Sequence, residues 1–331
     1  MRHPPGRPAV LCRPPIWGLL FCHCVFLYLH KELDLDLGMI VKGSKPDDVS
    51  QVSTTFLVFF LVYYGGQCYA RYYDMYNACM KMAGDVQSWV GLCRVYFPQA
   101  TPDVLWNLSR HMVASVYFLY FELGGLASDG GRVITEAEWS VLFRSSLISA
   151  SERKVLEKYR GSRFFLMQSW ALRLAAEQAA KPDSNAGKDG IRELEKYALD
   201  LRAAGAQISN LLKQPVPFPM YHTLMLMMSV NLVVLSYAMI EANTIMSVPT
   251  FFIISFVCLG LKETAIALSD PFGMDAVDFE TDVFMARIMI NTKELIARQA
   301  TYVPKEMPLP PMNFYGESPE DGPTAAGDYN A

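Results

Sequence analysis

The stretch TTFLVFFLVYYGG, residues 54–66, decides the fold class. It lies at the centre of a run, 49–70, that contains no Asp, Glu, Lys or Arg. An α-helix rises about 1.5 Å per residue, so roughly 20 apolar residues cross the hydrocarbon core of a bilayer, which is about 30 Å thick. Soluble domains seldom carry an uncharged apolar run of this length. The run therefore predicts a membrane-spanning helix.

Three more uncharged apolar runs occur, at 14–30, 220–240 and 242–261. Together the four runs predict an all-α protein with four transmembrane helices. Basic residues collect on the cytoplasmic side of membrane proteins, so the arginines ahead of the first run, Arg2, Arg7 and Arg13, place the N-terminus inside. A signal peptide would end in a small-residue cleavage site, whereas the sequence continues HKELDLD, so we expect a retained helix.

Composition excludes several other classes. Of the 331 residues, 52% are hydrophobic and 19% are charged, with a net charge of −4. Disordered chains are poor in apolar residues, and nucleic-acid binders carry a clustered basic excess, so both classes are excluded. The seven cysteines form no disulfide framework. The sequence contains no nucleotide-binding loop, no nucleophile elbow and no His/carboxylate set, so we expect neither an enzyme nor an organic cofactor.

The apolar runs divide the chain into five parts. We expect an N-terminal segment with two transmembrane helices at 1–70, a cytosolic helical domain at 71–219 and two more transmembrane helices at 220–267. An acidic segment with a cytosolic helix follows at 268–301, and a proline-rich flexible tail at 302–331.

Three patterns support helices in the cytosolic domain. The apolar segment 111–121, HMVASVYFLYF, is too short to cross a bilayer and predicts a buried core helix. Thr135 with Glu138 three residues later is a capping box, which predicts a helix start. Between 189 and 213, apolar residues recur at helical spacing and predict one buried face.

One face of the second transmembrane helix carries Thr55, Phe59 and Tyr63, because residues at i, i+4 and i+8 lie on the same side. Two interpretations remain open. The side chains could pack against other helices. Alternatively, several subunits around an axis could turn each position into a ring, and apolar rings gate a pore by dewetting. Aromatic ring edges are electropositive, so such a pore would tolerate anions better than cations.

The segment SDPFGMDAVDFETD, 269–282, is acidic. Its carboxylates are Asp270, Asp275, Asp278, Glu280 and Asp282. Calcium takes six to eight oxygen ligands from carboxylates and carbonyls, so the segment suits a calcium site, although it lacks the EF-hand pattern. The alternative is an acidic surface solvated by water.

Three stretches together resemble the bestrophin family of anion channels. They are GLKETAIALSDPFGMDAVDFETD at 260–282, PVPFP at 215–219 and FLVYYGGQCYARYYDMY at 60–76. The order and spacing of these stretches match the family over roughly 16–300. In that family an arginine followed by aromatic residues closes the second helix, so the resemblance implies a helix end at Arg71.

The resemblance also implies an assembly and its sites. It implies a homopentamer in which Thr55, Phe59 and Tyr63 form the rings of a narrow neck. A second, cytosolic aperture would fall at Val216. A calcium clasp would use the side chains of Asp275 and Asp278 with a backbone contribution from Asp270. Thr55 departs from the apolar or aromatic residues usual in the neck, and its hydroxyl should ease hydration there.

These inferences predict a multi-pass membrane protein that conducts anions passively. We expect chloride, and bicarbonate as an alternative, to pass through a hydrophobic neck, with modulation by calcium or another ligand and no nucleic-acid partner. The alternative from another class is a non-conducting membrane scaffold whose cytosolic domain binds partners. The expected location is the plasma membrane, with the chloroplast thylakoid membrane as the alternative.

Overall fold

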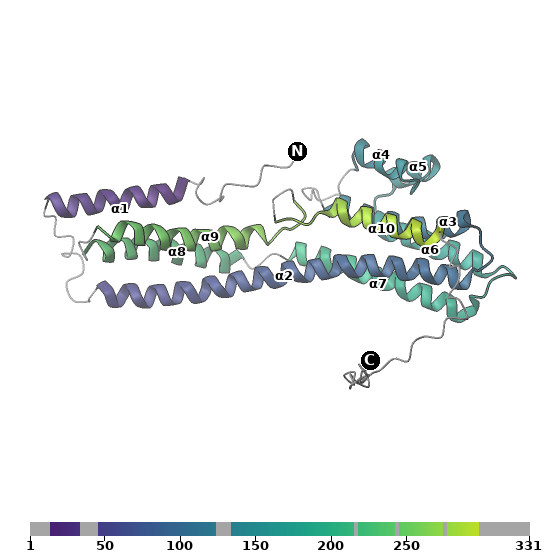
Figure 1. Cartoon of the computed structure of the whole chain (residues 1–331), viewed down its shortest axis with the longest axis horizontal. Coiled ribbons are helices and arrows are strands. Elements are labelled where there is room, and N and C mark those ends of the chain that lie inside the picture. Colours follow the sequence, from purple (N-terminus) through teal and green to yellow (C-terminus); the bar gives the residue numbers. More distant parts are fainter. Residues whose placement is uncertain are drawn as a thin grey trace, which may run out of the picture. The chain divides into compact units, whose positions relative to one another are not determined.

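The computed structural model describes residues 14–33, 46–123, 134–214, 218–241, 245–273 and 277–297. All regular structure in these ranges is α-helical, so the all-α prediction is confirmed for them (Figure 1). The helices are α1 Pro14–Leu33, α2 Pro46–Tyr96, α3 Pro102–Leu123, α4 Glu136–Arg144, α5 Ala150–Lys158, α6 Arg163–Ala179, α7 Gly187–Lys213, α8 Phe218–Glu241, α9 Ser247–Ala267 and α10 Thr281–Ala297. The predicted tail, 302–331, lies outside the described residues.

The longest helix, α2, corrects one expectation. It continues for 51 residues and does not end at Arg71. Gly65 and Gly66 each cost the helix only about 1 kcal/mol, and no proline occurs between Pro46 and Pro98 to stop it. The half after Arg71 also packs against α3, α7 and α10, which supplies the stabilisation that propensity alone does not. One continuous helix therefore crosses the predicted boundary between 1–70 and 71–219.

Two helices are long and apolar enough to cross a membrane, at Met220–Met239 in α8 and at Ser247–Ala267 in α9. Only 28% of each apolar window is buried inside the chain, which is low for core helices of a soluble protein. These two are the helices that meet this criterion of length and hydropathy within the described residues. The count of four transmembrane helices therefore stays a prediction.

These apolar helices form a first packing unit, which we call the apolar bundle. α8 and α9 pack against each other and against both α1 and α2. Their buried side chains are Ile16, Leu57, Leu61, Tyr64, Cys68, Leu224, Met228, Leu232, Cys258, Leu259 and Ala265. His23 makes polar contacts inside the bundle, where its ring nitrogens are 2.9 Å from Ser236 Oγ and 3.4 Å from Ser247 Oγ. His23 thereby links α1 to α8 and α9.

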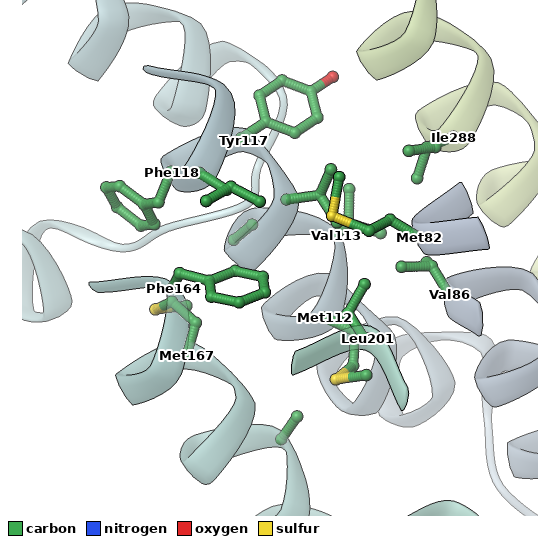
Figure 2. Close-up of a cluster of buried hydrophobic side chains, with 14 of the residues drawn as sticks. Met82, Val86, Met112, Val113, Tyr117, Phe118, Phe164, Met167, Leu201 and Ile288 are labelled. Carbon is green, nitrogen blue, oxygen red and sulfur yellow. The ribbon is translucent and has the colours of Figure 1, made fainter. Parts of the chain in front are cut away.

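The second half of α2 belongs to a different packing unit, the helical domain. There α2 and α3 pack with α6, α7 and α10 around a large apolar core (Figure 2). Phe118, Phe164 and Leu201 meet in this core from three helices. Every residue of 111–121 is buried, which confirms the predicted core helix. The predicted apolar face of 189–213 is also confirmed, because Leu194, Leu201 and Ile208 of α7 are buried.

The two short helices α4 and α5 both begin with a capping box. Thr135 Oγ1 accepts a hydrogen bond from Glu138 N at 3.3 Å, and Thr135 N donates to the Glu138 carboxylate at 2.8 Å, as predicted. Ser149 and Glu152 form the same arrangement at the start of α5, which the sequence analysis did not predict. Each box satisfies backbone groups that a helix start otherwise leaves without partners.

Candidate pore-lining helix and acidic loop

The predicted neck residues Thr55, Phe59 and Tyr63 all lie on α2 and are exposed in the single chain. Phe59 is 64% exposed and Tyr63 is 49% exposed. The ring of Phe59 meets Phe60 of the same helix edge to face, with centroids 5.6 Å apart. The other described helices therefore leave the side chains of Phe59 and Tyr63 largely uncovered. Lipid, a neighbouring subunit or the lumen of a pore would have to cover it.

An exposed stripe continues from the neck residues down α2. In the helical domain Met75, Ala78, Cys79, Met82 and Val86 of α2 are buried, whereas Asn77, Lys81 and Gly84 are exposed. Because 18 residues make five full turns, Asn77 lies directly below Phe59 and Lys81 directly below Tyr63. We call the line from Thr55 to Gly84 the α2 stripe.

Arg71 ties α2 to the end of α7. Its guanidinium donates hydrogen bonds to the backbone carbonyls of Leu211 and Gln214, the latter at 2.5 Å. The last carbonyls of a helix lack partners within the helix and carry partial negative charge, so a cation there satisfies and stabilises them. The contact holds the C-terminal end of α7 against α2. The predicted aperture residue, Val216, follows this end and lies outside the described residues.

The acidic loop between α9 and α10 is anchored on α2 and α3 by two aromatic side chains. Phe272 and Phe279 are buried and meet edge to face at 5.4 Å. Phe279 N donates to the carbonyl of Pro271 at 2.8 Å, which closes the loop. The rings of Tyr72 in α2 and Phe279 have centroids 4.8 Å apart. The Tyr72 hydroxyl also donates a hydrogen bond of 3.0 Å to the carbonyl of Val277. The loop therefore contacts α2 directly.

Two of the predicted calcium ligands lie in the described part of this loop. The amide of Phe272 donates to Asp270 Oδ1 at 3.5 Å, a weak contact. A Cβ added to Gly273 would lie 2.8 Å from Asp278 Oδ2, so a larger residue there would require that carboxylate to move. Asp275 lies outside the described residues. In the described ranges no three His, Cys, Asp or Glu side chains gather as a metal site would require. Calcium binding stays a prediction.

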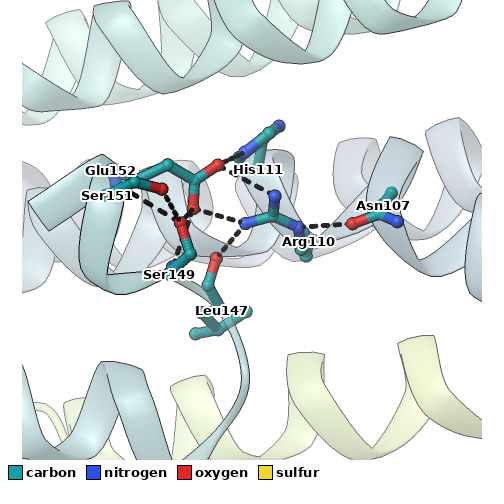
Figure 3. A network of polar contacts seen from close by, with 7 residues as sticks. All are labelled: Asn107, Arg110, His111, Leu147, Ser149, Ser151 and Glu152. Atoms are coloured by element: carbon teal, nitrogen blue, oxygen red, sulfur yellow. Dashed lines mark hydrogen bonds and ion pairs between the residues drawn. The ribbon is translucent and has the colours of Figure 1, made fainter.

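The sequence did not predict a partly buried ionic network in the helical domain (Figure 3). Arg110 of α3 binds the carboxylate of Glu152 in α5 through two hydrogen bonds of 2.8 Å. His111 Nε2 donates to the same carboxylate at 2.9 Å. Arg110 also donates to the carbonyl of Leu147 at 2.9 Å and to the side-chain oxygen of Asn107 at 2.8 Å. The network fastens α5 to α3.

Burial and hydrogen bonding compete in this network. Burial disfavours the charged carboxylate of Glu152, but the hydrogen bonds from His111 and Arg110 outweigh it and hold the pKa of Glu152 well below its usual range. For His111, burial dominates over the Glu152 contact and lowers the pKa from its ordinary value. Among the described residues His111 Nδ1 has no hydrogen-bond partner, so a second proton there would be buried without an acceptor from them.

Part of this network has a signal in the sequence. Ser149 followed by Glu152 is a capping box and could have been found by its spacing. Arg110 and His111 could not be assigned, because only the tertiary fold brings α3 and α5 together.

The fold and the exposed stripe define an all-helical membrane protein in which one long helix connects an apolar bundle to a helical domain. A family model described as "Bacterial/Fungal Bestrophin protein" matches residues 13–294. The match spans most of the sequence, and the chain belongs to the bestrophin family.

Solved structures share the fold at low sequence identity. A variant of a bacterial bestrophin homologue from Klebsiella pneumoniae superposes with a TM-score of 0.73 at 16% identity, covering 86% of this chain and 98% of that one. The same homologue, phased with zinc, gives a TM-score of 0.71 at 15% identity over 86% and 97% of the two chains. A crystal structure described as a membrane protein gives 0.72 at 15% identity, over 86% and 100%. No curated protein matches the sequence.

Proposed function

We propose that the protein is a passive anion channel of the plasma membrane, with chloride and bicarbonate as permeant ions. In this proposal five copies of the chain surround one axis and each contributes the α2 stripe. The observation that carries the proposal is that stripe. In the helical domain one face of α2 stays exposed to solvent. This exposed face lies on the same side of the helix as the predicted neck residues.

The neck would act by dewetting. Rings of Phe59 and Tyr63 present apolar surface that water leaves readily, so a narrow ring closes to ions without a charged gate. When the neck is wet, the electropositive edges of the aromatic rings favour an anion over a cation. Thr55 adds a hydroxyl one turn away, which would ease hydration at the end of the neck.

The acidic loop would supply the modulation by calcium or another ligand. Its contact with α2 through Tyr72 gives a change in the loop a direct path to the pore-lining helix. Carboxylate and carbonyl oxygens are the ligands that calcium prefers. Calorimetry should show calcium binding to the purified wild-type protein and none to the double variant Asp275→Ala/Asp278→Ala. If the wild-type protein binds no calcium even at a large excess of the ion, modulation by calcium is rejected.

The proposal of conduction is tested by recording from the purified full chain in planar bilayers under a chloride gradient. A channel of this type should give currents whose reversal potential moves toward the chloride equilibrium potential, and replacement of chloride by bicarbonate should preserve the current. The absence of current, or a reversal potential that ignores the chloride gradient, would reject the channel and leave a non-conducting scaffold.

A further inference from the structure

We propose that two charged positions on the α2 stripe, Asp74 and Lys81, set the ratio of anion to cation permeability below the neck and act in opposite directions. The inference rests on the proposed function, because it requires the stripe to face the lumen. It goes further by assigning selectivity to two residues outside the neck and the acidic loop.

Helix geometry places both residues below the neck. Lys81 follows Tyr63 by 18 residues, which is five full turns and about 27 Å along the helix axis. Asp74 follows Tyr63 by 11 residues, which is about 20° beyond three turns and about 16 Å along the axis. Both residues are exposed. α2 is unbroken over this length, so the phase of the helix carries through from the neck to Lys81.

The side chains along the stripe change in kind below the neck. Phe59 and Tyr63 are large and aromatic, whereas Gly66 and Ala70 are small, so the lumen widens between Tyr63 and Tyr73, the exposed residue five turns below Thr55. A wider lumen holds water, in which charges are screened over about 8–10 Å at moderate ionic strength. Only charges on the wall itself therefore act on a passing ion. Asp74 and Lys81 are the charged residues that the stripe places on that wall.

The charge of Lys81 is largely balanced by neighbours. Its ammonium lies 2.9 Å from Asp85 Oδ2 and 3.9 Å from Asp200 Oδ1. Asp74, in contrast, has no hydrogen-bond or ion-pair partner among the described residues. Asp85, which is buried, and Asp200 of α7 thus compensate Lys81, whereas the carboxylate of Asp74 is uncompensated, so the wall is net acidic.

A net acidic wall attracts cations and repels anions. In the proposed channel, anion preference therefore arises at the neck, and the wall below reduces it. Removing the carboxylate of Asp74 should raise anion preference. Removing the ammonium of Lys81 should lower it, because Asp85 and Asp200 would then act without compensation.

The test measures reversal potentials of the full chain in planar bilayers under a potassium chloride gradient. For five charges around a lumen, Coulomb's law with screening suggests a change of about threefold in the permeability ratio. Asp74→Asn should raise the chloride-to-potassium ratio by about this factor, and Lys81→Gln should lower it. Both effects should shrink as the salt concentration rises.

Matched controls separate charge from other effects. Asp74→Glu and Lys81→Arg keep the charge at each position and should keep the wild-type ratio. Asp103→Asn in α3 and Lys154→Gln in α5 remove exposed charges away from the stripe and should also leave it unchanged. If the variants in α3 and α5 change the chloride-to-potassium permeability ratio as much as Asp74→Asn and Lys81→Gln do, the inference is overturned.

The outcomes also distinguish the inference from the function on which it rests. A conducting wild type whose ratio is unchanged in Asp74→Asn and Lys81→Gln, or is shifted in the same direction by both, overturns the inference alone. A wild type that carries no current overturns the proposed channel as well.

Discussion

The apolar bundle and the helical domain use the same apolar residues in opposite ways. In α3 of the helical domain, the whole segment 111–121 is buried by neighbouring helices. In α8 and α9 of the apolar bundle, only 28% of each apolar window is buried within the chain. A similar hydrophobic sequence thus forms a closed core in one region and an uncovered surface in the other. Apolar content alone does not say which of the two a segment will form.

The two regions also differ in how they use polar side chains. The helical domain fastens α5 to α3 through a network with a bidentate Arg110–Glu152 pair. The apolar bundle has neutral contacts, such as His23 with Ser236 and Asn231 with Thr54 at 3.2 Å. Charges without partners are costly inside a bilayer, whereas neutral hydrogen bonds between helices are tolerated there. The difference agrees with a membrane environment for the bundle.

The largest expected effect is on the core of the helical domain. Phe118 is fully buried and packs edge to face on Trp139 at 5.8 Å. Phe118→Ala should lower the free energy of unfolding by about 3–5 kcal/mol, because it leaves a cavity. Chemical denaturation of the detergent-solubilised protein measures this. Val95→Ala, at a 65% exposed position, is the control and should change stability by less than about 0.5 kcal/mol.

A smaller loss of stability is expected in the ionic network. Glu152→Gln keeps the shape of the side chain but removes the charge that binds Arg110 and His111. It should cost about 2 kcal/mol, less than for a fully buried pair, because both side chains of the Arg110–Glu152 pair keep some exposure. The same denaturation experiment measures it, and Glu177→Gln, in the exposed pair with Arg173, is the control. Equal losses for Glu152→Gln and Glu177→Gln would mean that the network is no tighter than a surface ion pair.

Acidification should weaken the same network in two steps. The folded pKa of His111 is lowered, so its stabilising effect is present above the ordinary value of 6.5 and is lost as the pH falls below it. The folded pKa of Glu152 is also lowered, so its contribution is complete above 4.5 and is lost at more acidic pH. When the pH is lowered from 7.5 to about 5, the free energy of unfolding should therefore decrease more for the wild type than for His111→Gln. Identical pH slopes would show that His111 titrates alike in both states.

The smallest effect on stability, with a large effect on current, is expected in the neck. Phe59 is mostly exposed in the chain, so Phe59→Ala should change the free energy of unfolding by less than about 0.5 kcal/mol. In the proposed pore the same change widens an apolar ring and favours wetting, so leak current should rise. Val58→Ala, at a 49% exposed neighbouring position off the stripe, is the control. Unchanged currents in both Phe59→Ala and Tyr63→Ala would move the pore axis to another face of α2.

Sequence patterns that depend on local spacing were the reliable ones. The capping box at Thr135 and the buried faces of α3 and α7 were predicted and are confirmed. The helix end at Arg71 was wrong, because the arginine caps α7 and not its own helix. That role depends on a residue 140 positions away along the chain, which no local pattern reports.

By itself the sequence determined the all-α class, the division into apolar runs and charged segments, and the face of α2 that carries Thr55, Phe59 and Tyr63. These properties follow from hydrophobicity and from the 3.6-residue period, which act over one or two turns of helix. Only the tertiary structure decided that α2 is unbroken, that its stripe extends to Lys81, and that Arg110, His111 and Glu152 meet. Each of these depends on contacts between distant segments, and such contacts form only when the helices pack.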